Sequence, residues 1–258
     1  EASNKYPFIG NNKSPFDVIC KIASKSAPKN GNPGFFFYET RNGHNFRAID
    51  DLISQTPAAI YFRNDVNRSS VSDNSNDFKI VSFSIIKNQN LINALKSGVY
   101  SSRMCSYNPK TQRFEEKQFN IRPLKKSLGK KEVPTPQDKK HTRILYSVKD
   151  VGCLSSESKE SNEGDVNTYQ GEVQMRYNLL FTQMVKMQVP CNPNLKAGDI
   201  VKCNLEIITP GEKVQGSTDP VESGNYMILD LCHHYDPERS FTAMTLVRDT
   251  YGLHTNKN

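Results

Sequence analysis

The sequence lacks the short motifs that mark the commonest enzyme classes. It contains no G-x-S-x-G nucleophile elbow, no G-x-x-x-x-G-K-[ST] phosphate loop and no G-x-G-x-x-G dinucleotide loop. No Cys-His pair carries the local signature of a cysteine protease. These absences argue against hydrolase, nucleotidase and dehydrogenase chemistry, so we predict no enzymatic activity, no catalytic residue and no cofactor. An unrecognised enzyme stays an alternative, and so does a basic nucleic-acid-binding module, which a pI of about 9.0 would suit.

Long apolar runs are also missing. No stretch is long enough to span a bilayer, and the first residues do not form a signal-peptide pattern. Only 36% of the 258 residues are hydrophobic, and the mean hydropathy is -0.65. This balance predicts a soluble protein, either a β-rich one that buries further area against partners or a hydrophilic monomer.

Six cysteines are present, but no C-x-x-C pair occurs among them. Scattered thiols in a chain of this length indicate reduced, buried small side chains. A zinc site built on Cys203, Cys232 and His234 is the alternative. It is disfavoured because a structural site needs further ligands, so we predict no bound metal.

The C-terminal part carries the clearest strand patterns. Val185, Met187 and Val189 alternate with polar residues until Pro190. A later pair of strands is separated by the polar turn 236–239. Five residues form the predicted core of this hairpin: Met227, Leu229, Leu231, Met244 and Leu246.

The N-terminal half alternates helix and hairpin signals. Ser14-Pro15 begins a predicted helix with Phe16, Ile19, Cys20 and Ala23 on one stripe. The pattern then predicts a hairpin over 34–47 that turns at Asn42-Gly43, followed by a short helix over 49–53 and a loop over 63–77. A strand over 78–86, a helix over 89–96 and a second hairpin, formed by 99–107 and 113–120, come next. Glu39 is interpreted as a solvated strand residue, and Asp50 and Asp51 as acidic residues in the first turn of a helix, not as paired catalytic carboxylates.

Two long patterns resemble one protein family. SPFDVICKIA with GFFFYETRNGHNFRAIDDLI, and VPCNPNLKAGDIVKCNLEI with SGNYMILDLCHHYDPERSFTAMTLVRD, are similar to the baseplate hub proteins of contractile-tailed bacteriophages. The resemblance implies a structural hub subunit that forms a homotrimeric ring between the tail tube protein and the central spike protein, contacts other baseplate proteins and lines the conduit through which phage DNA passes. It implies a place in the virion tail after assembly in the host cytoplasm, and a further β domain before Glu1.

Most of the net charge lies in the segment 121–143. It holds eight basic and two acidic residues, a net charge of +6 against +7 for the whole chain. Two interpretations stay open: a solvated connector, and an arm that binds nucleic acid or an acidic partner. The candidate lysines of this arm are Lys125, Lys126, Lys130, Lys131, Lys139 and Lys140.

These signals together predict an α+β, β-rich fold. We expect a mixed α+β domain over 1–120, the basic connector over 121–143 and an antiparallel, tube-like or barrel-like β domain over 144–258. A strand through Ile144, Tyr146 and Val148 and one helix from Tyr169 to Met184, packed on the last sheet, complete the prediction. Ring contacts are expected at strand edges, with 240–247 as a candidate edge, and at the connection 209–223.

Overall fold

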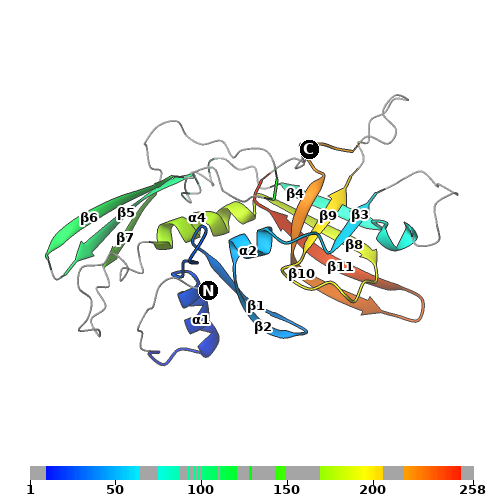
Figure 1. Cartoon of the computed structure of the whole chain (residues 1–258), viewed down its shortest axis with the longest axis horizontal. Coiled ribbons are helices and arrows are strands. Elements are labelled where there is room, and N and C mark those ends of the chain that lie inside the picture. The colour runs from blue at the N-terminus through cyan, green and yellow to red at the C-terminus, as the bar shows by residue number, and fades with distance from the viewer. Residues whose placement is uncertain are drawn as a thin grey trace.

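The computed structural model describes residues 10–63, 75–87, 92, 96, 98, 100–109, 111–120, 128–129, 143–148, 169–205 and 218–250. Three sheets and a small set of helices make up this part of the chain (Figure 1). Most of the predicted helix over 89–96, most of the loop over 63–77, most of the connection 209–223 and all six candidate lysines lie outside these residues. The β-rich α+β class is confirmed.

The N-terminal elements follow the predicted order. Helix α1 (Pro15–Ala23) is capped by the Ser14 side chain, whose oxygen accepts the backbone N–H of Asp17 at 3.2 Å. Strands β1 (Phe35–Thr40) and β2 (Gly43–Ala48) form the hairpin, and α2 (Ile49–Ile53) follows directly. Because Thr40 pairs with Gly43, the two loop residues are Arg41 and Asn42, one position earlier than the predicted Asn42-Gly43 turn.

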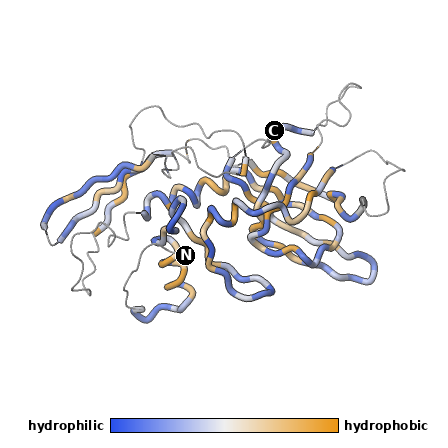
Figure 2. Tube along the Cα trace, viewed as in Figure 1, coloured by the Kyte–Doolittle hydropathy of each residue, from blue (hydrophilic) through white to orange (hydrophobic). Residues whose placement is uncertain are grey.

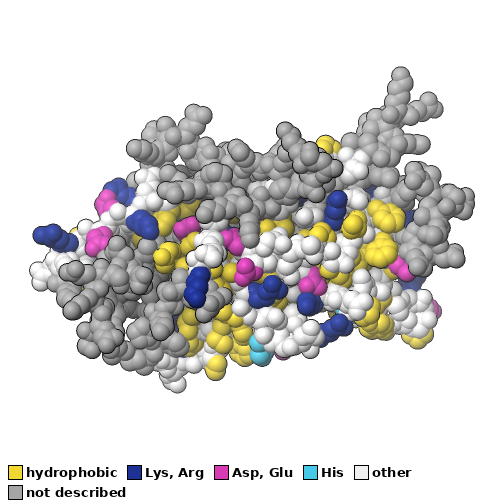
Figure 3. All heavy atoms as spheres, in the orientation of Figure 1, with side chains coloured by type: hydrophobic (Ala, Val, Ile, Leu, Met, Phe, Trp, Pro, Cys, Tyr) yellow, Lys and Arg dark blue, Asp and Glu magenta, His cyan; other side chains and the backbone are white. Residues whose placement is uncertain are grey.

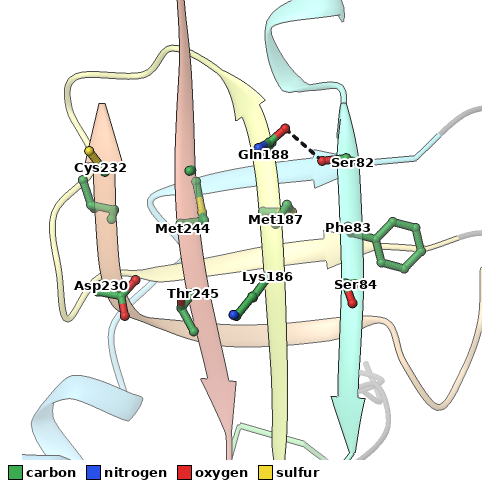
Figure 4. Close-up of a pocket in the computed structure, with 12 residues that line it drawn as sticks. Ser82, Phe83, Ser84, Lys186, Met187, Gln188, Asp230, Cys232, Met244 and Thr245 are labelled. Carbon is green, nitrogen blue, oxygen red and sulfur yellow. Dashed lines mark hydrogen bonds between the residues drawn. The ribbon is translucent and has the colours of Figure 1, made fainter. Parts of the chain in front are cut away.

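A six-stranded sheet in the order β3-β9-β10-β11-β8-β4 dominates the molecule. Its strands are β3 (Ala59–Phe62), β4 (Ser82–Lys87), β8 (Gln183–Pro190), β9 (Ile200–Asn204), β10 (Gly224–Tyr235) and β11 (Ser240–Arg248). The sheet curls on itself, so that β3 and β9 cross behind β11, β8 and β4 (Figures 1 and 4). The 3₁₀-helix η1 (Ser75–Phe78) lies between β3 and β4 in the chain.

The curl encloses the larger of the two main apolar cores. Val185, Met187 and Val189 point into it from β8, as the alternation predicts, and polar and apolar residues alternate along these strands (Figure 2). Ile80 closes one corner, because its N–H donates to the carbonyl of Phe62 at 3.0 Å. The remaining buried members are Ala59, Tyr61, Leu195, Val201, Cys203, Leu205, Tyr226, Ile228, Met244 and Leu246.

The L-x-x-G-D part of the resemblance has a structural role. Gly198 adopts φ +86°, and a side chain there would meet the Tyr38 hydroxyl at 2.5 Å. Its N–H donates to the Ile228 carbonyl at 2.8 Å, and the Ile228 N–H donates to the Asp199 carbonyl at 2.9 Å. These bonds tie the turn before β9 to the middle of β10.

The predicted burial of Leu229 is wrong, and a β-bulge explains the difference. The register of β10 against β11 shifts between Ile228 and Asp230, so Leu229 is the extra residue and is 38% exposed. The strict alternation of Met227, Leu229 and Leu231 is therefore broken. Met227 is buried on one face of the sheet, while Leu231 is half-buried on the other.

A separate three-stranded sheet in the order β6-β5-β7 lies at the far end of the molecule (Figure 1). Strands β5 (Ser101–Asn108) and β6 (Arg113–Asn120) form the predicted hairpin. Strand β7 (Arg143–Val148) pairs with β5 in parallel, where an antiparallel domain had been expected. Parallel pairing requires a long connection, and residues 109–142 separate the two strands in sequence.

Helix α4 (Gln170–Leu180) connects the six-stranded sheet, called the large sheet, and the three-stranded sheet, called the small sheet. In the middle of the helix, Met175 packs with Met104 and Phe119 of the small sheet. Near its end, Leu180 packs with Ile200, Met227 and Val247 of the large sheet, in a second core that includes α2. The helix ends at Leu180 and not at Met184, because Gln183 already begins β8.

Strand pairing crosses the predicted domain boundaries. Strands β3 and β4 come from before residue 120 yet border the sheet formed by β8 to β11. Strand β7 comes from after residue 142 yet pairs with β5. The division into domains at 120 and 143 therefore stays a prediction, and hydrogen bonding links its two outer parts.

Candidate assembly surface

The two outer strands of the six-stranded sheet, β3 and β4, offer backbone groups for further pairing. Each pairs along one side with a described strand, β3 with β9 and β4 with β8. On the other side of β3, Phe62 forms a single bridge with Lys79. Unpaired N–H and C=O groups on an edge strand are a template for a strand of another chain.

The two edges carry almost none of the charges that usually block such pairing. Strand β3 reads AIYF, and β4 reads SFSIIK with a charge only at its last residue. Ile60 and Ile86 are 49% and 45% exposed on these strands. Natural sheets protect their edges with lysine, proline or inward-pointing charges, and within the described strands only Lys87 at the end of β4 is such a residue.

Strand β6, an outer strand of the small sheet, is different. It reads RFEEKQFN, with charged side chains at Arg113, Glu115, Glu116 and Lys117. An antiparallel second copy of this strand centred on either glutamate would oppose like charges directly, which is destabilising. The charge pattern therefore protects β6, whereas β3 and β4 are candidate pairing edges.

The sheet topology fixes how copies can join through these edges. Strand β3 is parallel to β9, and four successive antiparallel pairings lead from β9 to β4. Following the sheet, β3 and β4 therefore run in the same sense. Head-to-tail contact would pair β4 of one copy in parallel with β3 of the next, which is the geometry of a ring. The strand 240–247, named above as a candidate edge, is β11 and lies inside the sheet between β10 and β8.

Strands β10, β11, β8 and β4 present a polar groove on their outer face (Figure 4). Register places Ser84, Lys186, Thr245 and Asp230 in one row across the four strands. The neighbouring row contains Ser82, Gln188, Ala243 and Cys232, and the Ser82 hydroxyl donates to the Gln188 side chain at 3.0 Å.

The groove is large in volume, but few of its side chains are charged or reactive. Its volume is about 560 Å³, and its outward side chains are small and neutral apart from Lys186 and Asp230. One positive and one negative charge balance each other, so the groove has no net charge. Among its lining residues no nucleophile and base form a catalytic pair. Alternation along the strands was the only sequence signal for this face.

A buried ion pair joins α4 to the N-terminal elements. The Arg176 guanidinium donates to the Asp50 carboxylate at 2.5 Å, and both side chains are about 5–6% exposed. Arg176 also donates to the carbonyls of Asn32 and Pro33, each at 3.1 Å. Asp50 accepts the Asn32 N–H at 2.7 Å. Asp50 lies in the first turn of α2, as predicted, but it is buried because α4 covers α2.

Sequence reasoning missed this pair, although one signal was available. Arg176 lies beside Val173, Tyr177 and Leu180 on the apolar stripe of α4, where a cation needs a buried partner. The neighbouring Tyr177 hydroxyl donates to the Phe35 carbonyl at 2.5 Å. Burial raises the pKa of Tyr177 to about 12, so this hydroxyl keeps its proton at neutral pH.

The L-V-R-D end of the resemblance is a buried anchor. Arg248 is fully buried, donates to the Gln183 side chain at 2.8 Å and to the Ser223 carbonyl at 3.2 Å, and lies over the Tyr226 ring at 4.5 Å. The Tyr226 hydroxyl in turn donates to the Glu222 carbonyl. This arginine fixes the start of β10 to β11 and β8, so its role is structural.

The next two residues, Asp249 and Thr250, form hydrogen bonds with the backbone of the basic segment 121–143. The Asp249 Oδ1 accepts the N–H of Leu128 at 2.9 Å, and the Thr250 hydroxyl oxygen accepts the N–H of Gly129 at 2.7 Å. Leu128 is 1% exposed within the second core. Burial raises the pKa of Asp249, and its Oδ2 has no hydrogen-bond partner among the described residues. The segment 121–143 is therefore docked on the large sheet at this point.

The remaining predicted site residues are spread over the fold. Met227, Met244 and Leu246 are buried, and Leu231 is half-buried. Cys203 is buried, which raises the pKa of its thiol to about 12. Cys232 and His234 are exposed on β10, and among the residues described above no His, Cys, Asp and Glu side chains gather as a metal site. No helix in the described part of the chain is long and apolar enough to cross a membrane.

Comparisons with known proteins give structural likenesses only. No protein-family model matches the sequence, and no curated protein matches it. Among solved structures, a tail protein from Neisseria meningitidis MC58 matches with a TM-score of 0.40 and 11% identity over 76% of this chain and 45% of that one. The 43 kDa tail protein of prophage MuSo2 from Shewanella oneidensis matches with a TM-score of 0.45 and 11% identity over 96% of this chain and 59% of that one.

A third match is to a topological model of the p2 virion baseplate in activated conformation. Its TM-score is 0.26 and its identity 13%, over 92% of this chain and 55% of that one. This chain thus spans about half the length of each of the three chains, at 45%, 59% and 55%.

Proposed function

We propose that this protein is a structural subunit of a phage tail baseplate hub, in which copies join edge to edge into a ring. The observation that carries the proposal is the pair of edge strands, β3 and β4, which carry no charge before Lys87 and run in the same direction. Such edges allow head-to-tail pairing, and head-to-tail contacts close into rings when the rotation is right. The sequence resemblance supports three copies in the ring.

In this proposal the tail tube protein lies above the ring and the central spike protein below it. The polar groove of β10, β11, β8 and β4 lines the conduit for DNA. Its small neutral side chains and its single balanced pair, Lys186 and Asp230, suit a wall past which a polyanion must slide. Fixed clusters of basic side chains would instead bind the phosphates and retain the DNA. Basic and acidic side chains are interspersed over the described part of the face in Figure 3.

The protein acts through main-chain geometry and not through catalysis. Parallel pairing of β4 with β3 would satisfy backbone groups without requiring new apolar surface. Substitution of single exposed polar side chains should therefore have little effect on the ring. Loss of an outward-facing backbone donor should have a large effect.

The test is a pair of proline variants in β4. Successive N–H groups of a strand point to opposite sides within the sheet. One of the variants Ser84→Pro and Ile85→Pro therefore removes an N–H that points toward β8, the inward donor, and the other removes an N–H that points away from β8, the outward donor. The variant that loses the outward donor should keep a cooperative melting transition but lose the ring. The other variant should be destabilised, because it breaks a hydrogen bond to β8.

Mass measured by light scattering decides the outcome. The expected wild type contains copies in multiples of three, and the outward variant does not. A wild type that never associates through β4, so that both proline variants leave the mass of the folded protein unchanged, overturns the ring. Electron microscopy of an assembled tail would then show whether β4 and β3 of neighbouring copies are in contact.

A further inference from the structure

Among the described residues, α4 covers one face of the small three-stranded sheet, and the other face is open. Register places nine side chains on the open face, in three rows across β6, β5 and β7. We call these nine residues the outer face: Phe114, Tyr107 and Val148; Glu116, Cys105 and Tyr146; Gln118, Arg103 and Ile144. The opposite face packs on α4 through Met104, Phe119 and Leu145.

The outer face is unusually apolar for a surface exposed to water. Tyr146 is 77% exposed, Phe114 72%, Val148 62% and Ile144 44%. A sheet with one solvated face normally alternates apolar residues inward and polar residues outward. Here β7 reverses that rule, because its outward residues are Ile144, Tyr146 and Val148.

The exposed apolar side chains are contiguous. The Phe114 and Tyr107 rings lie 5.1 Å apart between centroids, and Val148 is the register partner of Tyr107 on the other side. A fully exposed aromatic side chain presents about 200 Å², so Phe114 and Tyr146 alone expose about 300 Å². The other members raise the patch to about 500 Å², at the upper end of what monomers expose.

The charges of the outer face are self-complementary. Arg103 and Glu116 form an ion pair on it, and they are its only charged residues. Two copies of the face related by a two-fold axis can exchange partners, so that Arg103 of each copy meets Glu116 of the other. A neutral face of this kind does not repel itself, and tyrosine, phenylalanine and arginine are the residues enriched in interfaces.

We propose that the outer face binds the same face of a second copy of this chain. Two such patches together remove about 1,000 Å² of apolar surface from water, which reaches the area expected of a specific interface before any polar rim is counted. The contact uses side chains of the small sheet only. It is therefore independent of the edges of the large sheet and of the proposed ring.

The experiment measures mass in four proteins and separates the two proposals. They are the wild type, the outward β4 proline variant, the outer-face variant Tyr146→Lys, and the protein with both changes. If both contacts exist, the masses correspond to more than one ring, two copies, one ring and one copy, respectively. If only the face contact exists, the wild type and the proline variant are both dimers. If only the ring exists, Tyr146→Lys has the mass of the wild type.

A matched control identifies nonspecific effects of the added lysine. Tyr235, at the tip of the β10–β11 hairpin, is 67% exposed and lies on another element. Tyr235→Lys should leave the mass unchanged, whereas Tyr146→Lys should weaken the dimer by about 30-fold or more, as for a central interface tyrosine. Equal masses for wild type, Tyr146→Lys and Tyr235→Lys overturn the proposal.

A charge exchange distinguishes a second copy from any other partner. Arg103→Glu and Glu116→Arg each place like charges across the two-fold axis, so each variant alone should be monomeric in the β4 proline background. An equimolar mixture restores opposite charges at both contacts and should form mixed dimers. If the mixture stays monomeric while each variant keeps the melting temperature of its parent, the face does not bind itself.

Discussion

The large and the small sheet expose opposite kinds of surface. The six-stranded sheet has apolar cores on parts of both faces, a polar open groove and two edges without charge before Lys87. The three-stranded sheet has a small core on one face, an apolar open face and a heavily charged strand, β6, at its edge. The first can therefore recruit neighbours through its backbone, and the second through its side chains.

This difference shows how a chain with a low hydrophobic content can still bind neighbouring copies. Backbone pairing needs little apolar surface, so a polar sheet with bare edges can still join a neighbour. Side-chain contact needs a patch, and the small sheet provides one because α4 covers only one of its faces. Helix α4 connects both sheets, and changes at its contacts test how far the two regions depend on each other.

The largest expected effect comes from the buried ion pair that fixes α4 to α2. Arg176→Ala leaves the Asp50 carboxylate buried without its cation and should lower the free energy of unfolding by about 3–5 kcal/mol. Urea denaturation measures this loss. The double variant Asp50→Ala with Arg176→Ala should be less destabilised than the sum of the two single variants, since the second change removes a group already left without a partner. A strictly additive result would mean that the two side chains do not interact.

The next effect separates the core of the large sheet from its bulge. Leu246→Ala removes a fully buried side chain and should cost about 2–5 kcal/mol. Leu229→Ala removes a bulge residue that is 38% exposed and should cost less than about 1 kcal/mol. Thermal and urea unfolding of both variants check the contrast. Equal losses would contradict the register shift between Ile228 and Asp230.

A smaller effect is expected where the basic segment docks on the large sheet. A side chain at Gly129 would lie 2.7 Å from the Thr250 carbonyl oxygen, so Gly129→Ala should destabilise the protein by about 1–3 kcal/mol. Gly10→Ala serves as the control, because a side chain there meets nothing within 4 Å. Differential scanning calorimetry of the two variants should show a lower melting temperature only for Gly129→Ala.

The smallest effect concerns how the stability of the protein depends on pH through Asp249. Burial raises the pKa of Asp249, so the folded state holds its proton more tightly than the unfolded state. Between the unfolded and the folded pKa, stability therefore falls as pH rises. Asp249→Asn keeps an acceptor for Leu128 but carries no charge, so it should gain about 1 kcal/mol at neutral pH and lose this slope. Melting temperatures across acidic pH measure the slope, and an unchanged slope would assign it to other groups.

Local chemistry was readable without the fold. The Ser14 cap with Pro15 predicted where α1 begins, and the bounds of α2 match the prediction because Ile49, Leu52 and Ile53 share one stripe. Alternation identified β8, β9 and the β10–β11 hairpin, and turn residues placed the β5–β6 hairpin. These features depend on contacts between near neighbours, so a single sequence contains the information that they need.

Only the tertiary structure decided which strands become neighbours and which charges become buried. The pairing of β3 with β9 and of β7 with β5 joins residues far apart in the chain, and periodicity carries no information about such partners. The bulge at Leu229 shifts the alternation, so that Met227 and Leu231 lie on opposite faces of the sheet. Asp50 is half of a buried ion pair because α4 packs against it, and β11 is an inner strand because β8 pairs with it. A sequence determines what each residue prefers locally, whereas long-range packing determines which residues it contacts.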